Sequence, residues 1–163
     1  EVERLRRLTQ DFLDLAREPA LVRAPFDLSD VAADAARAVS HAYPEVAVEV
    51  AVPPLRVDAD VARVRQVVSN LLVNAAQAGA RHIQLQGRAD GGFARIVVED
   101  DGRGIPPDLR GRLFEPFATS KPGGTGLGLA LSRRIAERHG GTLGLAGGGE
   151  RTAFDLRLPL ARG

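Results

Sequence analysis

The chain has 163 residues, a mass of 17.3 kDa and a formal net charge of +1, with 44% hydrophobic and 26% charged residues. This balance is typical of one globular domain with a short appendage. Because 22 basic residues are offset by 21 acidic ones, it does not indicate nucleic-acid binding. The absence of cysteine excludes disulfides and thiolate metal sites. No apolar run reaches the ~18 residues of a membrane span.

The chain begins with a predicted helix over residues 1–18. Its apolar residues recur at helical spacing, namely Leu5, Leu8, Phe12 and Leu15. This pattern fits either a coiled-coil seam or an amphipathic helix packed on its own domain. Two prolines then break the chain, and we expect a linker over 19–26 and the main domain over 27–163. The first residue is not Met, so we expect a fragment of a longer protein.

The main domain mixes helices and strands without strict alternation. Asp27 or Ser29 can cap a helix that runs to about Ala42. Further helices are predicted over 60–78, 107–113 and 127–138, and strands over 46–52, 55–57, 82–86, 93–98, 143–145 and 152–158. This order favours an α/β two-layer sandwich, with a mixed sheet covered on one face by helices, over a doubly wound parallel sheet.

The helix over 60–78 carries a polar stripe on one face, made of Arg63, Gln66, Asn70, Asn74 and Gln77. A stripe of this kind usually faces solvent. Asparagine, however, costs roughly half a kcal/mol relative to alanine inside a helix, so two stacked asparagines suggest a further role. An asparagine carbonyl oxygen is a suitable ligand for Mg²⁺.

A carboxylate ends the strand over 93–98, where Asp100 is followed by Gly102, Gly104 and Ile105. Glycine allows the backbone to approach a ligand closely, and a carboxylate at a strand end can accept a hydrogen bond from an amine. The alternative is a surface turn capped by an aspartate.

A glycine-rich stretch over 119–128 leads into the helix over 127–138 and contains Lys121, the only lysine. Free N–H groups at a helix start attract phosphate, and a lysine adds positive charge. The spacing matches neither a P-loop nor a dinucleotide-binding fingerprint. A flexible linker is the alternative.

In this order, the segments resemble the ATP-binding catalytic domain of sensor histidine kinases, which has the GHKL or Bergerat fold. Residues 70–75 resemble its N box, 100–104 its G1 box, 114–117 its F box and 124–128 its G2 box. The resemblance covers roughly residues 27–160. It implies that residues 1–18 are the end of the second helix of a dimerisation hairpin.

The resemblance also implies roles for individual residues, with ATP and Mg²⁺ as ligands. Asp100 would accept from the adenine amine, Asn74 would bind Mg²⁺, and Asn70 would contact phosphate or the metal's water shell. Lys121 would reach the nucleotide from a lid, and Asn70 and Lys121 are the candidate catalytic residues. The remaining nucleotide-binding candidates approach through the backbone or form the wall, namely Gly102, Gly104, Ile105, Gly124, Thr125, Gly126, Leu127 and Gly128.

Three positions separate this chain from relatives of the same superfamily. Gyrase B and MutL-type ATPases carry a water-activating Glu where Asn70 stands, and an amide cannot act as a general base. We therefore expect phosphate transfer rather than rapid hydrolysis. Many relatives have a basic residue where Gln77 stands and an aromatic one where Ala78 stands, which puts one phosphate contact and one stacking contact in question but not the fold.

No histidine here resembles the family's phosphoacceptor. We expect His41 to be a surface residue, His82 to be structural and His139 to lie at a helix end. The acceptor would therefore lie on a hairpin outside this chain, in a parent that is a homodimer and passes phosphate to a response regulator. We expect a cytoplasmic domain, whether or not the parent is membrane-anchored. Two other functions remain open: a nucleotide-binding regulatory module without turnover, and a serine kinase of the anti-sigma-factor type.

Overall fold

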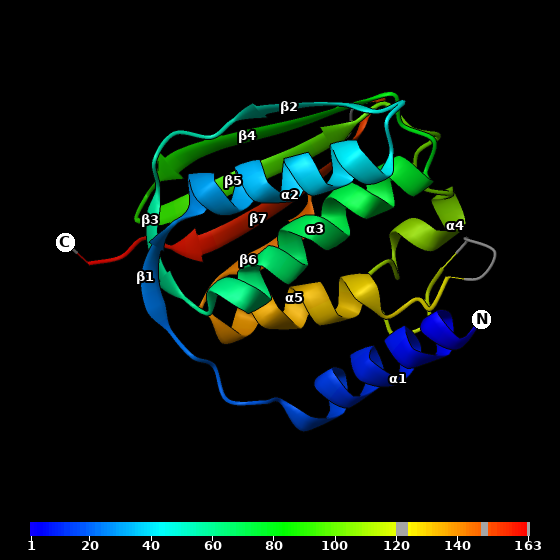
Figure 1. Cartoon of the computed structure of the whole chain (residues 1–163), viewed down its shortest axis with the longest axis horizontal. Helices are drawn as coiled ribbons and strands as arrows, with labels where there is room; N and C mark the ends of the chain where they lie inside the picture. The colour runs from blue at the N-terminus through cyan, green and yellow to red at the C-terminus, as the bar shows by residue number, and fades with distance from the viewer. Residues whose placement is uncertain (120–123, 148–149, 163) are drawn as a thin grey trace.

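The computed structural model describes residues 1–119, 124–147 and 150–162 and confirms the two-layer α/β sandwich. Three helices, α2 (Leu28–Ala42), α3 (Val61–Gln77) and α5 (Gly128–Arg138), cover one face of a five-stranded sheet (Figure 1). The sheet has the order β2-β4-β5-β7-β6, in which only β2 and β4 pair in parallel. Its strands are β2 (Ala47–Ala51), β4 (His82–Asp90), β5 (Phe93–Asp100), β6 (Thr142–Leu145) and β7 (Thr152–Pro159).

The two longest helices of the main domain, α2 and α3, each begin with an aspartate cap, and Asp27 is one of the two caps that the sequence analysis expects for α2. The carboxylate of Asp27 accepts from the N–H of Ser29 at 2.9 Å, and that of Asp60 accepts from the N–H of Arg63 at 3.3 Å. Both contacts satisfy donors that the first helical turn leaves without partners. The apolar faces of α2, α3 and α5 then pack on the sheet and form one core, whose fully buried members include Leu71, Leu72, Leu85, Ile96 and Leu156.

A short strand precedes α2, where the sequence analysis expects no strand. β1 (Ala24–Asp27) pairs antiparallel with β3 (Arg56–Ala59) in a two-stranded sheet. A proline is tolerated in such a strand because it lies at a sheet edge, where one side makes no ladder hydrogen bonds. Residues 24–26 therefore belong structurally to the main domain. The division into a hairpin helix, a linker and a catalytic domain remains a prediction.

The first helix, α1 (Val2–Arg17), packs beside α5 at the edge of the helical layer (Figure 1). This contact buries only part of the apolar face of α1. Leu15 packs against the core, whereas Leu5 and Phe12 are more than half exposed, at 56% and 53%. The remaining helix is the single turn α4 (Pro107–Arg110). Among the described residues, no helix combines the length and hydropathy needed to cross a bilayer.

Candidate functional site

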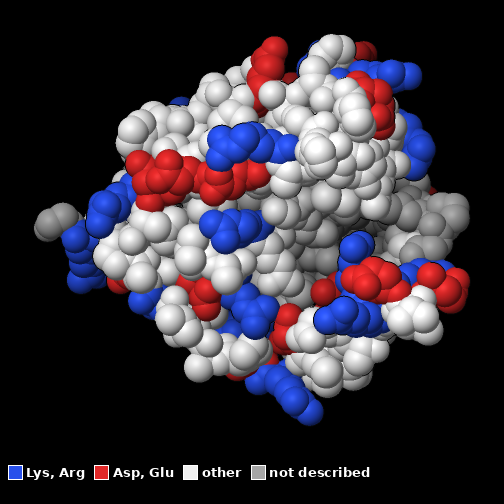
Figure 2. All heavy atoms as spheres, viewed as in Figure 1, with Lys and Arg blue, Asp and Glu red and all other residues white. Residues whose placement is uncertain are grey.

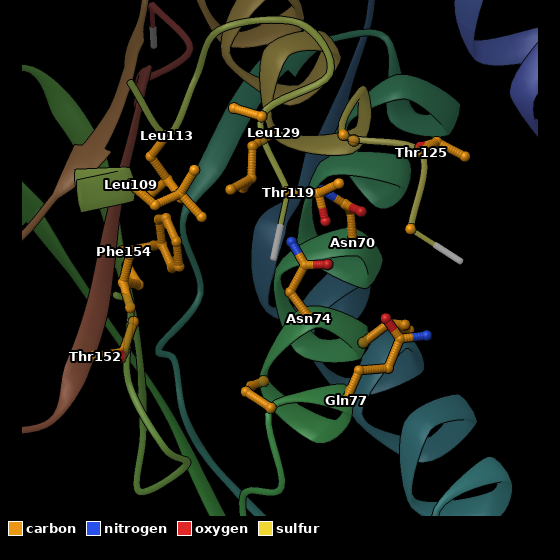
Figure 3. A pocket seen from close by; sticks show the side chains of 18 of the residues that line it. Asn70, Asn74, Gln77, Leu109, Leu113, Thr119, Thr125, Leu129, Thr152 and Phe154 are labelled. Carbon is orange, nitrogen blue, oxygen red and sulfur yellow. The ribbon is translucent and has the colours of Figure 1, made fainter. Parts of the chain in front are cut away.

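A cavity of about 610 Å³ lies between the end of β5, the middle of α3, the start of α5 and α1. Figure 3 shows Asn70, Asn74 and Thr119 on one side and Leu109, Leu113 and Phe154 on the other. The cavity brings together most of the residues that the sequence analysis selects. Those that line it are Asn70, Asn74, Asp100, Gly104, Ile105, Gly124, Thr125, Gly126 and Gly128.

The amide of Asn70 is fixed from α5. Its Nδ2 donates to the hydroxyl of Ser132 at 3.1 Å, and Ser132 is only 2% exposed. A Cβ added to Gly128 would lie 2.7 Å from Oδ1 of Asn70, so a larger residue at the start of α5 would displace that amide. The N box and the G2 box are therefore in direct contact, and Asn70 holds one orientation at the cavity wall.

Asn74 lies one turn further along α3, half-buried, and its side chain points into the cavity (Figure 3). The described residues contain no group of three or more His, Cys, Asp or Glu side chains that could hold a metal by itself. Mg²⁺ fits this donor set nevertheless, because it keeps several waters and takes few protein oxygens when phosphates supply the rest. Asn74 is the residue that would hold it.

Asp100 ends β5 at the cavity and is 4% exposed. Its Oδ1 accepts from the N–H of Gly102 at 2.8 Å, which leaves Oδ2 as the oxygen for a ligand. Burial raises the pKa of the Asp100 carboxyl, and the charges of Asp101 and Glu99 add to this effect. Such a group gains from a ligand that donates a hydrogen bond to its charged form.

Gly102 itself does not line the cavity but lies against the end of α3. A Cβ at this position would approach the carbonyl oxygen of Ala78 at 2.8 Å and Oδ1 of Asp100 at 2.9 Å. The next residue, Arg103, donates its N–H to the same Ala78 oxygen at 3.0 Å. Gly102 therefore allows the strand end and the helix end to meet, and it holds the Asp100 carboxylate in place.

The glycine-rich segment reaches the cavity at residues 124–126 and 128. Gly126 has a φ of +73°, and a Cβ there would lie 2.4 Å from the backbone of Phe117, so this segment packs directly on the F box. Leu127 is not among the residues that line the cavity, and its side chain is fully buried. Lys121 lies outside the described residues.

The structure adds cavity residues that sequence reasoning missed. Arg103 lies within the G1 box, and Thr152 and Phe154 come from β7, whose register places Thr152 opposite Asp100. Four more come from α1, namely Glu3, Arg4, Arg7 and Asp11. The i, i+3, i+7 spacing of Arg4, Arg7 and Asp11 marks a second polar face of that helix. The sequence could have indicated this polar face from its spacing, but it does not reveal what the face packs against.

The histidines have the surroundings that the sequence analysis expects. His41 is exposed in the last turn of α2. His82 begins β4, and its Nδ1 lies 2.9 Å from the carboxylate of Asp101. His139 ends α5 and is 3% exposed. Hydrogen bonds from the backbone N–H and ring of His82 hold the pKa of Asp101 well below its usual range.

Comparison with known proteins identifies the family. Residues 59–162 match the family described as histidine kinase-, DNA gyrase B- and HSP90-like ATPases. The chain belongs to this family. It is 36% identical to the probable sensor histidine kinase TcrY of Mycobacterium tuberculosis over an alignment of 173 positions that covers 98% of this chain and 36% of TcrY. The chain thus spans about a third of the length of such curated relatives.

Solved structures agree with this assignment. Full-length ShkA in complex with AMPPNP superposes with a TM-score of 0.83 at 34% identity, over 98% of this chain and 36% of ShkA. The ATP-binding domain of PrrB from Mycobacterium tuberculosis superposes with a TM-score of 0.73 at 30% identity, over 86% of this chain and 98% of PrrB. The predicted resemblance to a histidine kinase catalytic domain of the GHKL fold is confirmed.

Proposed function

We propose that this chain binds Mg²⁺·ATP in the cavity and transfers the γ-phosphate to a histidine on a dimerisation hairpin of its parent protein. One observation carries the proposal: amide, carboxylate and glycine-rich segments from three distant parts of the sequence border the same cavity of about 610 Å³. Its size falls within the range of small-molecule sites. The relatives are sensor histidine kinases, and ShkA was solved with an ATP analogue.

The adenine end of the nucleotide would lie at the G1 box. Oδ2 of Asp100 would accept from the adenine amine, since Oδ1 is already held by Gly102. Gly104 and Ile105 would form the wall beside the base. A buried carboxylate that accepts from an amine selects adenine over guanine, which presents a carbonyl at the corresponding position.

The phosphate end would lie at the start of α5. The backbone of residues 124–128 offers N–H groups there, and the helix dipole favours negative charge. Magnesium would neutralise phosphate charge and be held on the protein side by Asn74, while Asn70 would contact phosphate or metal-bound water. Lys121 would add a positive charge. Catalysis would rest on positioning and charge neutralisation rather than on a covalent intermediate.

Asn70 also sets the type of reaction. Its amide has no basic site at neutral pH, and its Nδ2 is committed to Ser132. Nothing at this position can activate water, so the γ-phosphate persists until an external nucleophile reaches it. We place the reaction in the cytoplasm, where ATP is available, with a response regulator as the final acceptor.

The test uses this chain, the parent's acceptor hairpin and ATP labelled at the γ-phosphate. We expect an acid-labile, alkali-stable phosphohistidine on the hairpin, and none on a hairpin whose acceptor histidine is replaced by Gln. ATP binding without transfer to any hairpin would instead identify a regulatory module. Acid-stable label on a serine would identify a serine kinase.

A further inference from the structure

One face of α1 brings two arginines to the cavity, outside all four sequence boxes. Arg4 and Arg7 line the cavity together with Glu3 and Asp11. Residues 4, 7, 11 and 14 follow helical spacing and share this face. Within the described part of the chain, the ion pairs of α1 and of the residue after it are made by Asp14 and Glu18, while the charge of Arg7 acts on Asp11 without a salt bridge.

Contacts at the other end of α1 fix this face in position. Asp14 forms a 3.0 Å ion pair with Arg63 of α3, and both side chains are largely buried, at 11% and 25% exposure. Glu18, which follows α1, pairs with Arg134 of α5. A partly buried ion pair is screened less by salt than an exposed one. α1 is therefore anchored to the two helices that carry Asn70 and Gly128.

The amino-terminal half of α1 lies at the phosphate end of the cavity. Figure 1 shows the start of α1 beside the segment that leads into α5. In Figure 2, charged side chains along α1 border a hollow that separates the helix from the rest of the domain. Arg4 and Arg7 line the same cavity as the described part of the glycine-rich segment and the start of α5, which would hold phosphate.

We propose that α1 forms a wall of the nucleotide cavity and that Arg4 and Arg7 bind the phosphate chain of the nucleotide. This inference rests on the proposed function. A guanidinium group presents a planar fork of donors that matches phosphate oxygens, and its long side chain reaches across a cavity. Gln77 on α3 carries no positive charge, so the two arginines would supply the cationic contact instead.

Asp11 on the same face does not cancel this contact. It borders the cavity too, but its short side chain keeps the carboxylate close to its own helix. Burial raises the pKa of Asp11 and the neighbouring Asp14 raises it further, while the positive charge of Arg7 lowers it. The negative charge of an approaching polyphosphate would also raise the pKa of Asp11 and favour its protonated form.

The wall also couples the nucleotide to the position of α1. If the phosphates contact Arg4 and Arg7 only when α1 is docked, nucleotide binding stabilises the docked helix by the same free energy with which docking strengthens binding. The chain thereby gains a link between its nucleotide state and the helix that leads towards the rest of the parent protein.

The test compares Arg4→Gln/Arg7→Gln with Arg6→Gln, which changes an exposed arginine of the same helix outside the cavity. Calorimetry on the whole chain measures the dissociation constants of adenosine, AMP, ADP and ATP with Mg²⁺. We expect the double variant to weaken ATP binding by about 10- to 100-fold, as loss of charge-assisted contacts predicts. The loss should grow with phosphate number and vanish for adenosine.

Three results would overturn the inference. The double variant could bind ATP as tightly as Arg6→Gln does, or it could weaken adenosine and ATP by the same factor. Either result would contradict a phosphate contact while leaving the proposed function intact. A wild-type chain that binds no ATP at all would contradict the proposed function, and the inference with it.

Discussion

The backbone N–H of Asp60 donates a 3.0 Å hydrogen bond to Nε2 of His139. Since Nε2 accepts, the ring proton is on Nδ1, which lies 2.8 Å from the carbonyl oxygen of Ile135 and donates to it. Asp60 caps α3, and its Oδ2 accepts from the N–H of Val22 at 3.0 Å. The neutral imidazole thus links the start of α3 to the end of α5, and Asp60 links both to the segment after α1.

The first prediction follows from the buried ring of His139. Burial opposes the charged form of His139 and lowers its pKa. The positive charges of Arg23 and Arg138 lower it too, whereas the hydrogen bond to Ile135 and the attraction of Asp60 act in the opposite direction. In the unfolded chain the ring protonates near 6.5. Its contribution to stability is therefore complete above pH 6.5 and is lost as the pH falls through the lowered pKa.

Urea unfolding between pH 7.5 and pH 5 measures this effect. The free energy of unfolding should fall over this range by about 1.4 kcal/mol for each unit by which the pKa is lowered. His139→Gln, which keeps an acceptor for the Asp60 N–H, should lose most of the pH dependence. His41→Gln changes an exposed histidine and should keep it. An unchanged slope in His139→Gln would disprove the assignment.

The second prediction concerns the base-binding carboxylate. Asp100→Asn should weaken binding of adenosine and ATP by a similar factor, because it removes one buried charge-assisted contact worth roughly 1.5–3 kcal/mol. Glu99→Gln is the matched control: it is adjacent on β5, faces away from the cavity and pairs with Arg151. Calorimetry that gives equal affinities for both variants would remove Asp100 from the base site.

The sequence predicted the helices and strands around these segments where their signals depend on local chemistry. The aspartate cap of α2 and the glycine-rich entry into α5 both follow from residues close together in the chain. The strand end at Asp100 and the amides of α3 converge because α3 packs on the sheet that contains β5.

Other features escaped prediction because they depend on distant contacts. β1 contains Pro25, a residue that predicts the end of regular structure. The strand tolerates it because β1 pairs with β3 at a sheet edge. The apolar seam of α1 predicts a partner but not which one, and the neighbouring Arg4 and Arg7 gain significance only once Asp14 meets Arg63, 49 residues away. Leu127 lies within the G2 box, yet its side chain is buried in the protein interior.

The third prediction concerns the metal. Asn74→Ala should weaken ATP binding by about 5- to 30-fold in magnesium, the effect of losing one polar contact to a charged group, and much less in excess chelator. Asn74→Asp restores an oxygen donor, which Mg²⁺ prefers, and should recover magnesium-dependent binding. Identical losses for Asn74→Ala with magnesium and with chelator would show that Asn74 does not act through the metal.

The last prediction tests the contact between the N and G2 boxes. In Gly128→Ala the added Cβ would lie 2.7 Å from Oδ1 of Asn70, and the buried Ser132 on the other side leaves that amide little room to move. Gly111→Ala is the matched control, because a Cβ there meets nothing within 4 Å and the backbone keeps an ordinary helical φ.

Overpacking of this kind costs typically 1–3 kcal/mol, so Gly128→Ala should lower the free energy of unfolding by that amount. It should also weaken ATP binding by about tenfold or more relative to Gly111→Ala, since it shifts both Asn70 and the start of α5. Adenosine, bound at Asp100, should lose less. If Gly128→Ala binds ATP as Gly111→Ala does, Asn70 and the start of α5 do not hold the phosphates.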